Sequence, residues 1–399
     1  MGNRAGFLLV AFLWVALGIN YVDRQMVYSI FPALKADLNF SDAQLGLVGG
    51  VFSWIYSICM PIAGRLADRF RRDRMIVLSM GLWSLATLGC GFSGSVAMFL
   101  FWRAVVALTE ALYYPAAVGM LAAAHGETTR SRALGIHQSA QLAGIVAGGW
   151  YGGWMADNVS WRAGFAFAAA AGIIYSIVLL RALPKAPPLA APAPLSWKDL
   201  KGLASSRCYV MLCAAFFAFC AMLWTFYAWF PSFLYERYQL SMTDSGFNAT
   251  VYVQVSCGVG VLIGGTLADR LAKFTPAARF YVAAAGVLLS APFGYLTFAA
   301  TSLDLARWFS AGYGVFSGFM VANVFAASYD VIERRNFGLG AGVLNMVGGI
   351  SAAIMIYTAG ALKATVGFAG LLQWVAALCV ASAIALVLTA RNRLPVEKQ

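Results

Sequence analysis

The chain has 399 residues, of which 61% are hydrophobic and only 11% are charged, and its mean hydropathy is +0.75. A soluble protein carries about 25% charged residues, so a soluble globular domain is excluded. The net charge of +12 does not indicate a nucleic-acid partner, because the basic residues sit in separate loops and form no stripe on one soluble domain. The composition indicates a helical protein that crosses a membrane several times.

Apolar runs of about twenty residues recur along the chain, each long enough for one membrane helix. A β-barrel would need shorter segments with alternating polar and apolar residues, which the sequence lacks. The seven cysteines are odd in number and form no CxxC pair, so neither a disulfide framework nor a metal site is predicted. The first residues run directly into an apolar stretch without a small-residue cleavage signal, which predicts a first membrane helix and no removable signal peptide.

Charged and Pro/Gly-rich breaks divide the sequence into twelve predicted membrane helices. We place them at 5–34, 43–67, 74–94, 97–125, 131–156, 161–182, 206–236, 244–271, 277–299, 303–330, 337–362 and 367–389. Residues 183–205 are too polar and too rich in proline to cross a bilayer, so they are predicted to be a linker. The expected fold is therefore all-α and polytopic, with a six-helix bundle at 1–182 and a second at 206–399.

Lysine and arginine gather in the loops on one side of these helices. Those loops contain Arg4, the cluster from Arg69 to Arg74, Arg130, Arg132, the linker lysines, Arg270, Lys273, Arg279, Arg334, Arg335 and the basic residues after Arg391. The opposite loops contain few. By the positive-inside rule, both termini and the linker are predicted to be cytoplasmic, in a cell membrane that is the inner membrane of a bacterium.

An internal repeat supports two related halves. The hexapeptide Gly64-Arg-Leu-Ala-Asp68-Arg69 recurs as Gly265-Thr-Leu-Ala-Asp269-Arg270, and 201 residues separate the two aspartates. Both copies follow the second predicted helix of their half. Repeated halves are typical of secondary transporters, which hold their substrate between the halves near the middle of the membrane.

The loop after the second helix, Gly64-x-Leu66-Ala67-Asp68-Arg69-x-x-Arg72, resembles the signature of the major facilitator superfamily. The resemblance implies the twelve-helix fold of that superfamily. It also implies a gate at the loop, with roles for Gly64, Asp68, Arg72 and Asp269.

Further motifs resemble the anion:cation symporter family, which includes bacterial hexuronate and galactonate transporters and sialin. They are Asn20-Tyr21-Val-Asp23-Arg24, Phe52-Ser-Trp-Ile-Tyr56 with Pro61, Arg103 with Glu110, and Gly135-Ile-His-Gln138-Ser139. The first of them, with Gln25 and the later Ser41-Asp-Ala-Gln-Leu-Gly46, also resembles bacterial spinster-like transporters. The resemblance to the symporters implies that Tyr21 and Tyr56 contact the substrate.

Four charged residues are predicted to be buried deep within membrane helices: Asp23, Arg24, Arg103 and Glu110. Charges at such depth are costly unless paired or hydrated, so each is a functional candidate. Arg103 and Glu110 are two helical turns apart and share a face, about 10 Å apart along the axis. We expect Arg24 and Arg103 to bind a carboxylate, with Arg24 the more important because Arg103 is predicted nearer the outer end of its helix, where it can snorkel.

The four charges sum to zero, which suggests how an anion could enter. A bound monoanion leaves one negative charge, and a proton taken up by Glu110, or by Asp23 in support, restores neutrality. The counting favours proton-coupled entry of an anion. The alternative is that all four residues form static ion pairs that hold the first and fourth helices together.

Neutral polar residues are weaker candidates for substrate contact. Tyr113 and Tyr114 lie one turn beyond Glu110, although a tyrosine in a membrane helix more often packs or anchors at the interface. Gln138 and Asn345 could hydrogen-bond substrate oxygens, and interhelical hydrogen bonding explains them equally well. The small-xxx-small pairs Gly144/Gly148, Gly149/Gly153 and Gly338/Gly342 predict close helix packing. His125 and His137 are too few and too far apart in sequence to bind a metal, so no metal or cofactor is expected besides the coupling proton.

The sequence thus predicts a proton-coupled symporter of small organic anions, acting as a monomer in the bilayer by alternating access. A spinster-like carrier of lysolipid-type amphiphiles is the alternative within transport. An integral membrane enzyme is the remote alternative, because it would need a nucleophile and base set of His, Ser or Cys that the sequence does not offer.

Overall fold

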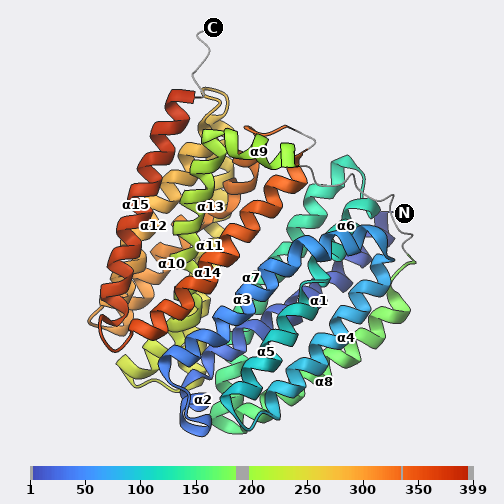
Figure 1. Cartoon of the computed structure of the whole chain (residues 1–399), viewed down its shortest axis with the longest axis vertical. Helices are drawn as coiled ribbons and strands as arrows, with labels where there is room; N and C mark the ends of the chain where they lie inside the picture. Colours follow the sequence, from blue (N-terminus) through green and yellow to red (C-terminus); the bar gives the residue numbers. More distant parts are fainter. Residues whose placement is uncertain (1–2, 186–196, 334–335, 394–399) are drawn as a thin grey trace. The chain divides into compact units, whose positions relative to one another are not determined.

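A computed structural model describes residues 3–185, 197–333 and 336–393. Every regular element in these ranges is helical (Figure 1). The helices are α1 (Asn3–Ser29), α2 (Phe31–Leu38), α3 (Asp42–Arg69), α4 (Arg72–Gly91), α5 (Val96–Glu110), α6 (Tyr113–Ala124), α7 (Glu127–Asn158), α8 (Trp161–Ala182), α9 (Trp197–Ser205), α10 (Arg207–Tyr238), α11 (Met242–Leu271), α12 (Ala278–Ala299), α13 (Leu303–Tyr329), α14 (Phe337–Leu362) and α15 (Gly367–Arg393).

Among the described residues, eleven stretches are long and apolar enough to cross a membrane, with α5 and α6 forming one of them. They coincide with eleven of the twelve predicted helices. The remaining predicted helix, 131–156, lies within α7, whose 32 residues exceed the length that a membrane span needs. The all-α polytopic fold is confirmed.

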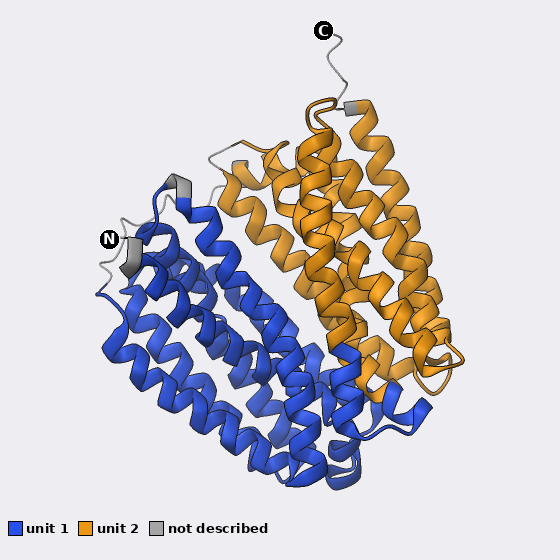
Figure 2. Cartoon of the chain, turned by 180° about the vertical axis from the view of Figure 1, so that it is seen from behind, with its two compact units in different colours: residues 1–193, 234–250 blue, residues 194–233, 251–399 orange. Residues whose placement is uncertain are grey.

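The chain divides into two compact units, coloured separately in Figure 2. Unit 1 contains residues 1–193 and 234–250, and unit 2 contains residues 194–233 and 251–399. The end of α10 and the start of α11 thus pack with the first six-helix half. Residues 186–196 of the predicted linker lie outside the described residues. The last nine residues of the linker, Trp197–Ser205, form the short helix α9.

Two predicted helices are interrupted where proline removes a backbone donor. The predicted helix 5–34 ends at Ser29, and α2 begins anew with Pro32 in its first turn. The predicted helix 97–125 is divided into α5 and α6 at Ala111 and Leu112. Pro115 has no N–H to donate to the carbonyl of Ala111, so the ladder of helical hydrogen bonds is interrupted directly after Glu110.

Serine residues begin several of the helices. The hydroxyls of Ser95, Ser160 and Ser302 accept the backbone N–H three residues later at the starts of α5, α8 and α13. Ser41 and Gln44 form a complete capping box at the start of α3. Such caps satisfy amide donors that a helix cannot pair internally, so they define where each helix begins.

Glycines bring α7 against α1, the helix that carries Asp23 and Arg24. A Cβ atom added at Gly144 or Gly148 would lie 2.7 Å from the carbonyl oxygen of Gly18 or Val22, so only glycine permits this approach. In the same way, Gly149 and Gly153 pack against the start of α11 inside unit 1. The prediction for Gly338 and Gly342 is wrong, because a Cβ added at either has no atom within 4 Å. A small-residue pattern shows that a helix can be approached closely. Whether it is approached depends on whether another helix lies against that face.

Candidate functional site

The four predicted membrane charges all lie in the interior of unit 1. Asp23 and Arg24 come from the last two turns of α1, and Arg103 and Glu110 come from α5. Their exposed fractions are 1%, 8%, 2% and 1%, respectively. Two acids and two bases with almost no exposed surface must be stabilised by one another and by the groups around them.

Arg24 and Glu110 form a buried ion pair that joins α1 to α5. The Nε atom of Arg24 donates to Oε2 of Glu110 at 2.7 Å, and Oε1 of Glu110 has no hydrogen-bond partner. The partner of Glu110 is therefore on another helix, 86 residues away, and the predicted face-sharing with Arg103 does not produce a pair. The guanidinium of Arg24, which we expected to bind the carboxylate of a substrate, is thus already paired with the carboxylate of Glu110.

Aromatic rings surround the guanidinium of Arg24. Its Cζ atom lies 4.2 Å from the ring centroid of Tyr56 and 5.1 Å from that of Tyr21, so the two tyrosines predicted from the family resemblance do meet at Arg24. The ring of Phe52 lies 4.7 Å from Cζ of Arg24 and 4.8 Å from Cζ of Arg103. Phe52 thus contacts both cations of the cluster and stacks on Tyr56.

Phe52 is a site residue that sequence reasoning missed. It appeared there only as part of a family motif. The available signal was its position one helical turn before Tyr56, which places both rings on one face of α3.

Arg103 is more deeply buried than predicted. Its exposed fraction is 2%, so it does not snorkel to the membrane surface. Its Nε and Nη2 atoms have no hydrogen-bond partner among the described residues. Two unsatisfied donors on a buried cation make Arg103 well suited to receive an oxygen-bearing ligand.

Asp23 is held from α4 by a residue that the sequence did not single out. The indole Nε1 of Trp83 donates to Oδ2 of Asp23 at 3.1 Å, and neither side chain is exposed by more than 1%. The other oxygen, Oδ1, has no hydrogen-bond partner. The signal for Trp83 was its position in mid-span, since membrane tryptophans usually lie at the interfaces.

The remaining substrate candidates lie in three different settings. The hydroxyl of Tyr113 donates to the carbonyl of Leu13 at 2.8 Å and lies 3.3 Å from Nε2 of His137, so Tyr113 is engaged in core contacts of α6 with α1 and α7. Tyr114 is half-buried beside the same histidine.

The two amide candidates bond within their own helices. Gln138 donates to Gln141 on α7, and Asn345 donates to the carbonyl of Ala341 in unit 2. Their contact with a substrate stays a prediction.

The predicted gate residues of unit 1 form a compact clamp. Arg72 is 6% exposed and donates to Oδ1 of Asp68 at 3.2 Å and to the carbonyls of Ala67 and Gly119. The clamp thus ties the end of α3 to α6. A Cβ atom at Gly119 would lie 2.8 Å from Cζ of Arg72, so a larger residue there would displace the guanidinium, whereas Gly64 has open space around it.

In unit 2 the repeated aspartate is held more loosely. Asp269 lies 3.8 Å from Nη2 of Arg279, which comes from α12 and donates to Asp330 at 2.7 and 3.0 Å. The main partner of Arg279 is therefore Asp330. A small pocket of about 330 Å³ borders this pair and is lined by Ala272, Pro276, Ala278, Arg279 and Asp330.

Among the described residues, no group of three His, Cys, Asp or Glu side chains could hold a metal ion. The seven cysteines form no disulfide with one another or with any other described residue.

Comparisons with known proteins identify the family of the chain. The family model described as Major Facilitator Superfamily matches residues 13–356. A probable galactarate/D-glucarate transporter of Escherichia coli (strain K12) is 27% identical over 94% of this chain and 90% of its own length. A D-galactonate transporter of Escherichia coli O6:H1 is 25% identical over 97% of this chain and 96% of its own length.

Spinster proteins are also similar. Protein spinster homolog 1 of Rattus norvegicus is 29% identical over 74% of this chain and 61% of its own length. The crystal structure of a bacterial homolog of the human lysosomal transporter spinster, inward-facing and unoccupied, has a TM-score of 0.79 at 18% identity and covers 98% of this chain and 96% of its own. At that identity the likeness is one of fold.

Proposed function

Because the chain belongs to the Major Facilitator Superfamily, whose named relatives are transporters and not enzymes, we propose that it is a proton-coupled symporter of a small organic anion. The substrate is a monocarboxylate or a sugar carboxylate, and it crosses by alternating access. One observation carries the proposal: the buried ion pair of Arg24 with Glu110, surrounded by Tyr21, Phe52 and Tyr56.

The ion pair supports coupling because it makes a substrate carboxylate and Glu110 rivals for one guanidinium. When Glu110 takes up a proton, it loses the charge that attracts Arg24, and Arg24 can bind the substrate instead. The net charge of the cluster is then the same before and after, which matters in a site of low dielectric constant. Asp23 is a second carboxylate that can share the proton.

Recognition of the anion falls to the residues around Arg24. Arg24 supplies a planar fork, Arg103 brings two donors without partners, and the hydroxyls of Tyr21 and Tyr56 can bond substrate oxygens. Relatives are named for the transport of galactarate, D-glucarate and D-galactonate, which combine carboxylates with hydroxyl groups. That combination suits a site made of guanidinium and phenol.

The test is transport by purified protein in liposomes with an imposed pH gradient, using D-galactonate, D-glucarate and a simple monocarboxylate as labelled probes. We expect accumulation by the parent, and expect Glu110→Gln to lose accumulation while it retains counterflow exchange. Glu236→Gln is the matched control, because it makes the same change on an exposed side chain at the end of α10. A Glu110→Gln protein that still concentrates its substrate would refute the coupling role.

A lysolipid-type amphiphile is the second candidate, favoured by the likeness to spinster proteins and by the aromatic lining of the site. A thermal-shift screen at two pH values separates the two. Stabilisation by sugar acids or monocarboxylates supports the anion, and stabilisation by lysolipids alone supports the amphiphile.

A further inference from the structure

Trp83 of α4 donates a hydrogen bond to the carboxylate of Asp23. Its indole nitrogen lies 3.1 Å from Oδ2, and the bond is fully shielded from solvent. An indole N–H can donate but cannot accept. The geometry therefore makes Oδ2 an acceptor in every protonation state of Asp23.

The ring of Trp83 is held firmly in this position. It packs edge-on against Tyr113, with ring centroids 5.6 Å apart and planes at 88°. Tyr113 is itself held by its hydrogen bond to the carbonyl of Leu13. Trp83 cannot turn away from Asp23 without disturbing α1 and α6 as well.

The other groups that face Asp23 are few. Glu110 and Arg103 act on it from α5, and Cys90 and Tyr151 lie within electrostatic range. Thr87, one turn further along α4, is a second donor to the carboxylate, through its hydroxyl. The hydroxyl of Tyr151 donates to the carbonyl of Gly164. The donor observed at Oδ2 is the indole of Trp83.

We propose that Trp83 is a positioning residue for proton exchange: it directs the proton to Oδ1 of Asp23 and leaves Oδ2 as the hydrogen-bonded carbonyl of the acid. In this step a hydronium ion transfers a proton to Oδ1: its O–H bond breaks, an O–H bond forms at Oδ1, water is released, and the carboxylate becomes a neutral acid. The proposal rests on the proposed function, in which Asp23 shares the coupling proton with Glu110. It extends that function to a residue on a third helix, outside the ion pair.

The bond also sets how readily the acid forms. A donor to the ionised carboxylate stabilises the charged form, so its loss favours the protonated form. Trp83→Phe should therefore move the pH profile of counterflow to higher pH by about one to two pH units, a tenfold to hundredfold change in proton concentration, as expected for one hydrogen bond to a charged group.

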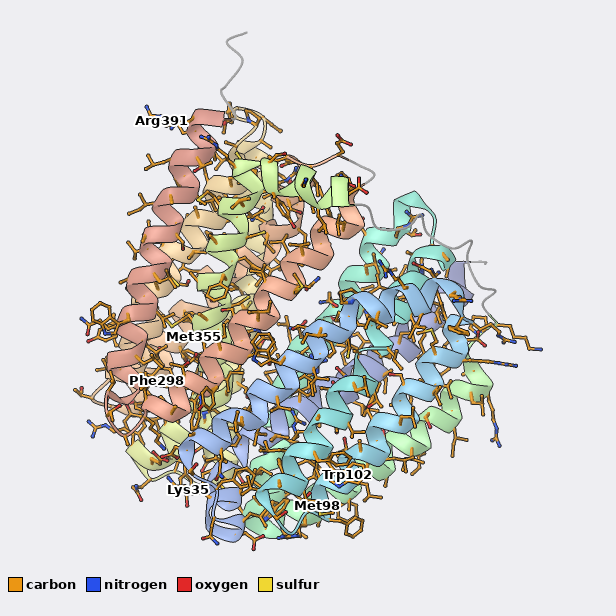
Figure 3. The ribbon with its side chains drawn as sticks, viewed as in Figure 1. Lys35, Met98, Trp102, Phe298, Met355 and Arg391 are labelled. Atoms are coloured by element: carbon orange, nitrogen blue, oxygen red, sulfur yellow. The ribbon has the colours of Figure 1, made fainter. Side chains whose placement is uncertain are left out.

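Trp102→Phe is the matched control. Trp102 lies on α5 (Figure 3) and packs against Gly89 of α4, the helix that carries Trp83, and its indole nitrogen has no hydrogen-bond partner. The control removes the same atoms from the same bundle and should leave the pH profile unchanged. In an Asp23→Asn background, Trp83→Phe should have no further effect on the profile, because the acceptor carboxylate is gone.

Infrared difference spectroscopy supplies a readout that needs no substrate. The carbonyl band of protonated Asp23 is identified by its loss in Asp23→Asn. In Trp83→Phe this band should move to higher frequency, because a carbonyl freed from a hydrogen bond has a stiffer C=O bond. If Trp83→Phe does not fold, 3-benzothienylalanine at position 83 keeps the outline of tryptophan without the N–H and takes its place in both measurements.

The outcomes separate the two proposals. If the parent shows no proton-driven accumulation, the proposed function fails, and the infrared band still decides the role of Trp83. If the parent is coupled but Trp83→Phe matches Trp102→Phe in both the pH profile and the carbonyl band, Trp83 does not position Asp23 and this inference is overturned.

Discussion

The two units share a repeated loop sequence but differ in where they bury charge. Every buried arginine, aspartate and glutamate among the described residues belongs to unit 1, including Arg72 and Asp73 beside the loop and the four residues of the membrane cluster. The buried polar side chains described in unit 2 are neutral, for example Gln254, Asn323 and Ser351. Proton exchange within the membrane can therefore be performed by unit 1, whereas unit 2 offers neutral surfaces and hydrogen bonds.

The repeated loops show the same asymmetry. In unit 1 the arginine four residues after the aspartate, Arg72, is buried and bonds to Asp68 and two carbonyls. In unit 2 the residue at that spacing is Lys273, and Asp269 meets Arg279 of the next helix at the limit of an ion pair. A repeat in sequence thus preserves the aspartate but not its partner, and the strength of the contact depends on the partner.

The largest effect is expected at the centre of the charged cluster. Arg24→Lys keeps the charge but loses the planar fork, so binding of a carboxylate substrate should weaken by about 1.5–3 kcal/mol, roughly tenfold to more than a hundredfold. Binding is measured by calorimetry or by the half-saturating substrate concentration in counterflow. Arg307→Lys, on a partly exposed side chain of unit 2, is the control and should bind normally. Unchanged binding in Arg24→Lys would move recognition away from the guanidinium and towards apolar fit.

The glycines test the contrast between the two units through stability, because Gly148 of α7 is closely packed and Gly342 of α14 is not. At Gly148 a new Cβ would meet the backbone of Val22 at 2.7–2.8 Å, so Gly148→Ala should lower the free energy of unfolding by about 1–3 kcal/mol. At Gly342 the space is open, so Gly342→Ala should be neutral or raise the stability by up to about 1 kcal/mol. Thermal unfolding in detergent measures both. Equal changes at the two positions would contradict the packing of α7 on α1.

The two loop aspartates should differ in their effect on turnover. Asp68→Asn removes the charged partner of a buried arginine, so we expect turnover to slow several-fold with little change in substrate affinity. Asp269→Asn should slow it less than about twofold, because Arg279 keeps Asp330. Turnover in liposomes is measured together with distance distributions between spin labels on the α3–α4 and α11–α12 loops. If the distance distributions of Asp68→Asn are identical to those of the parent, Asp68 does not bias the conformation of the gate.

The smallest effect is expected outside the membrane spans, at Asp37. Hydrogen bonds from Arg162 and from the indole of Trp161 hold the pKa of this carboxyl below its ordinary value. A lowered pKa means that the ionised form stabilises the fold above about pH 4, and that this contribution is lost as the pH falls through the folded-state pKa.

Asp37→Asn should therefore lower the melting temperature at pH 7 by no more than about 2 °C, because the pair is partly exposed, and the difference should shrink below about pH 4. Asp304→Asn, in a more exposed ion pair at the start of α13, is the comparison and should change less. A difference between Asp37→Asn and the parent that widens towards acid would contradict the assignment.

The sequence by itself determined the membrane class, the helices and the composition of the cluster. Apolar runs of this length can satisfy their backbone groups in a bilayer only as helices. Two acids and two bases within those runs are costly unless paired or hydrated, so the sequence already indicated that they would cluster. The prolines show where the prediction failed: the predicted helices 5–34 and 97–125 ran past Pro32 and Pro115, and the structure divides both of them.

Only the tertiary structure decided which residues meet. Helical periodicity predicted that Arg103 and Glu110 share a face, yet the partner of Glu110 is Arg24, and Phe52 and Trp83 come to the cluster from α3 and α4. The depth of Arg103 and the open space at Gly338 and Gly342 were likewise hidden in the sequence. Periodicity describes the faces of one helix, whereas the pairing of faces depends on how side chains from several helices fill the same volume.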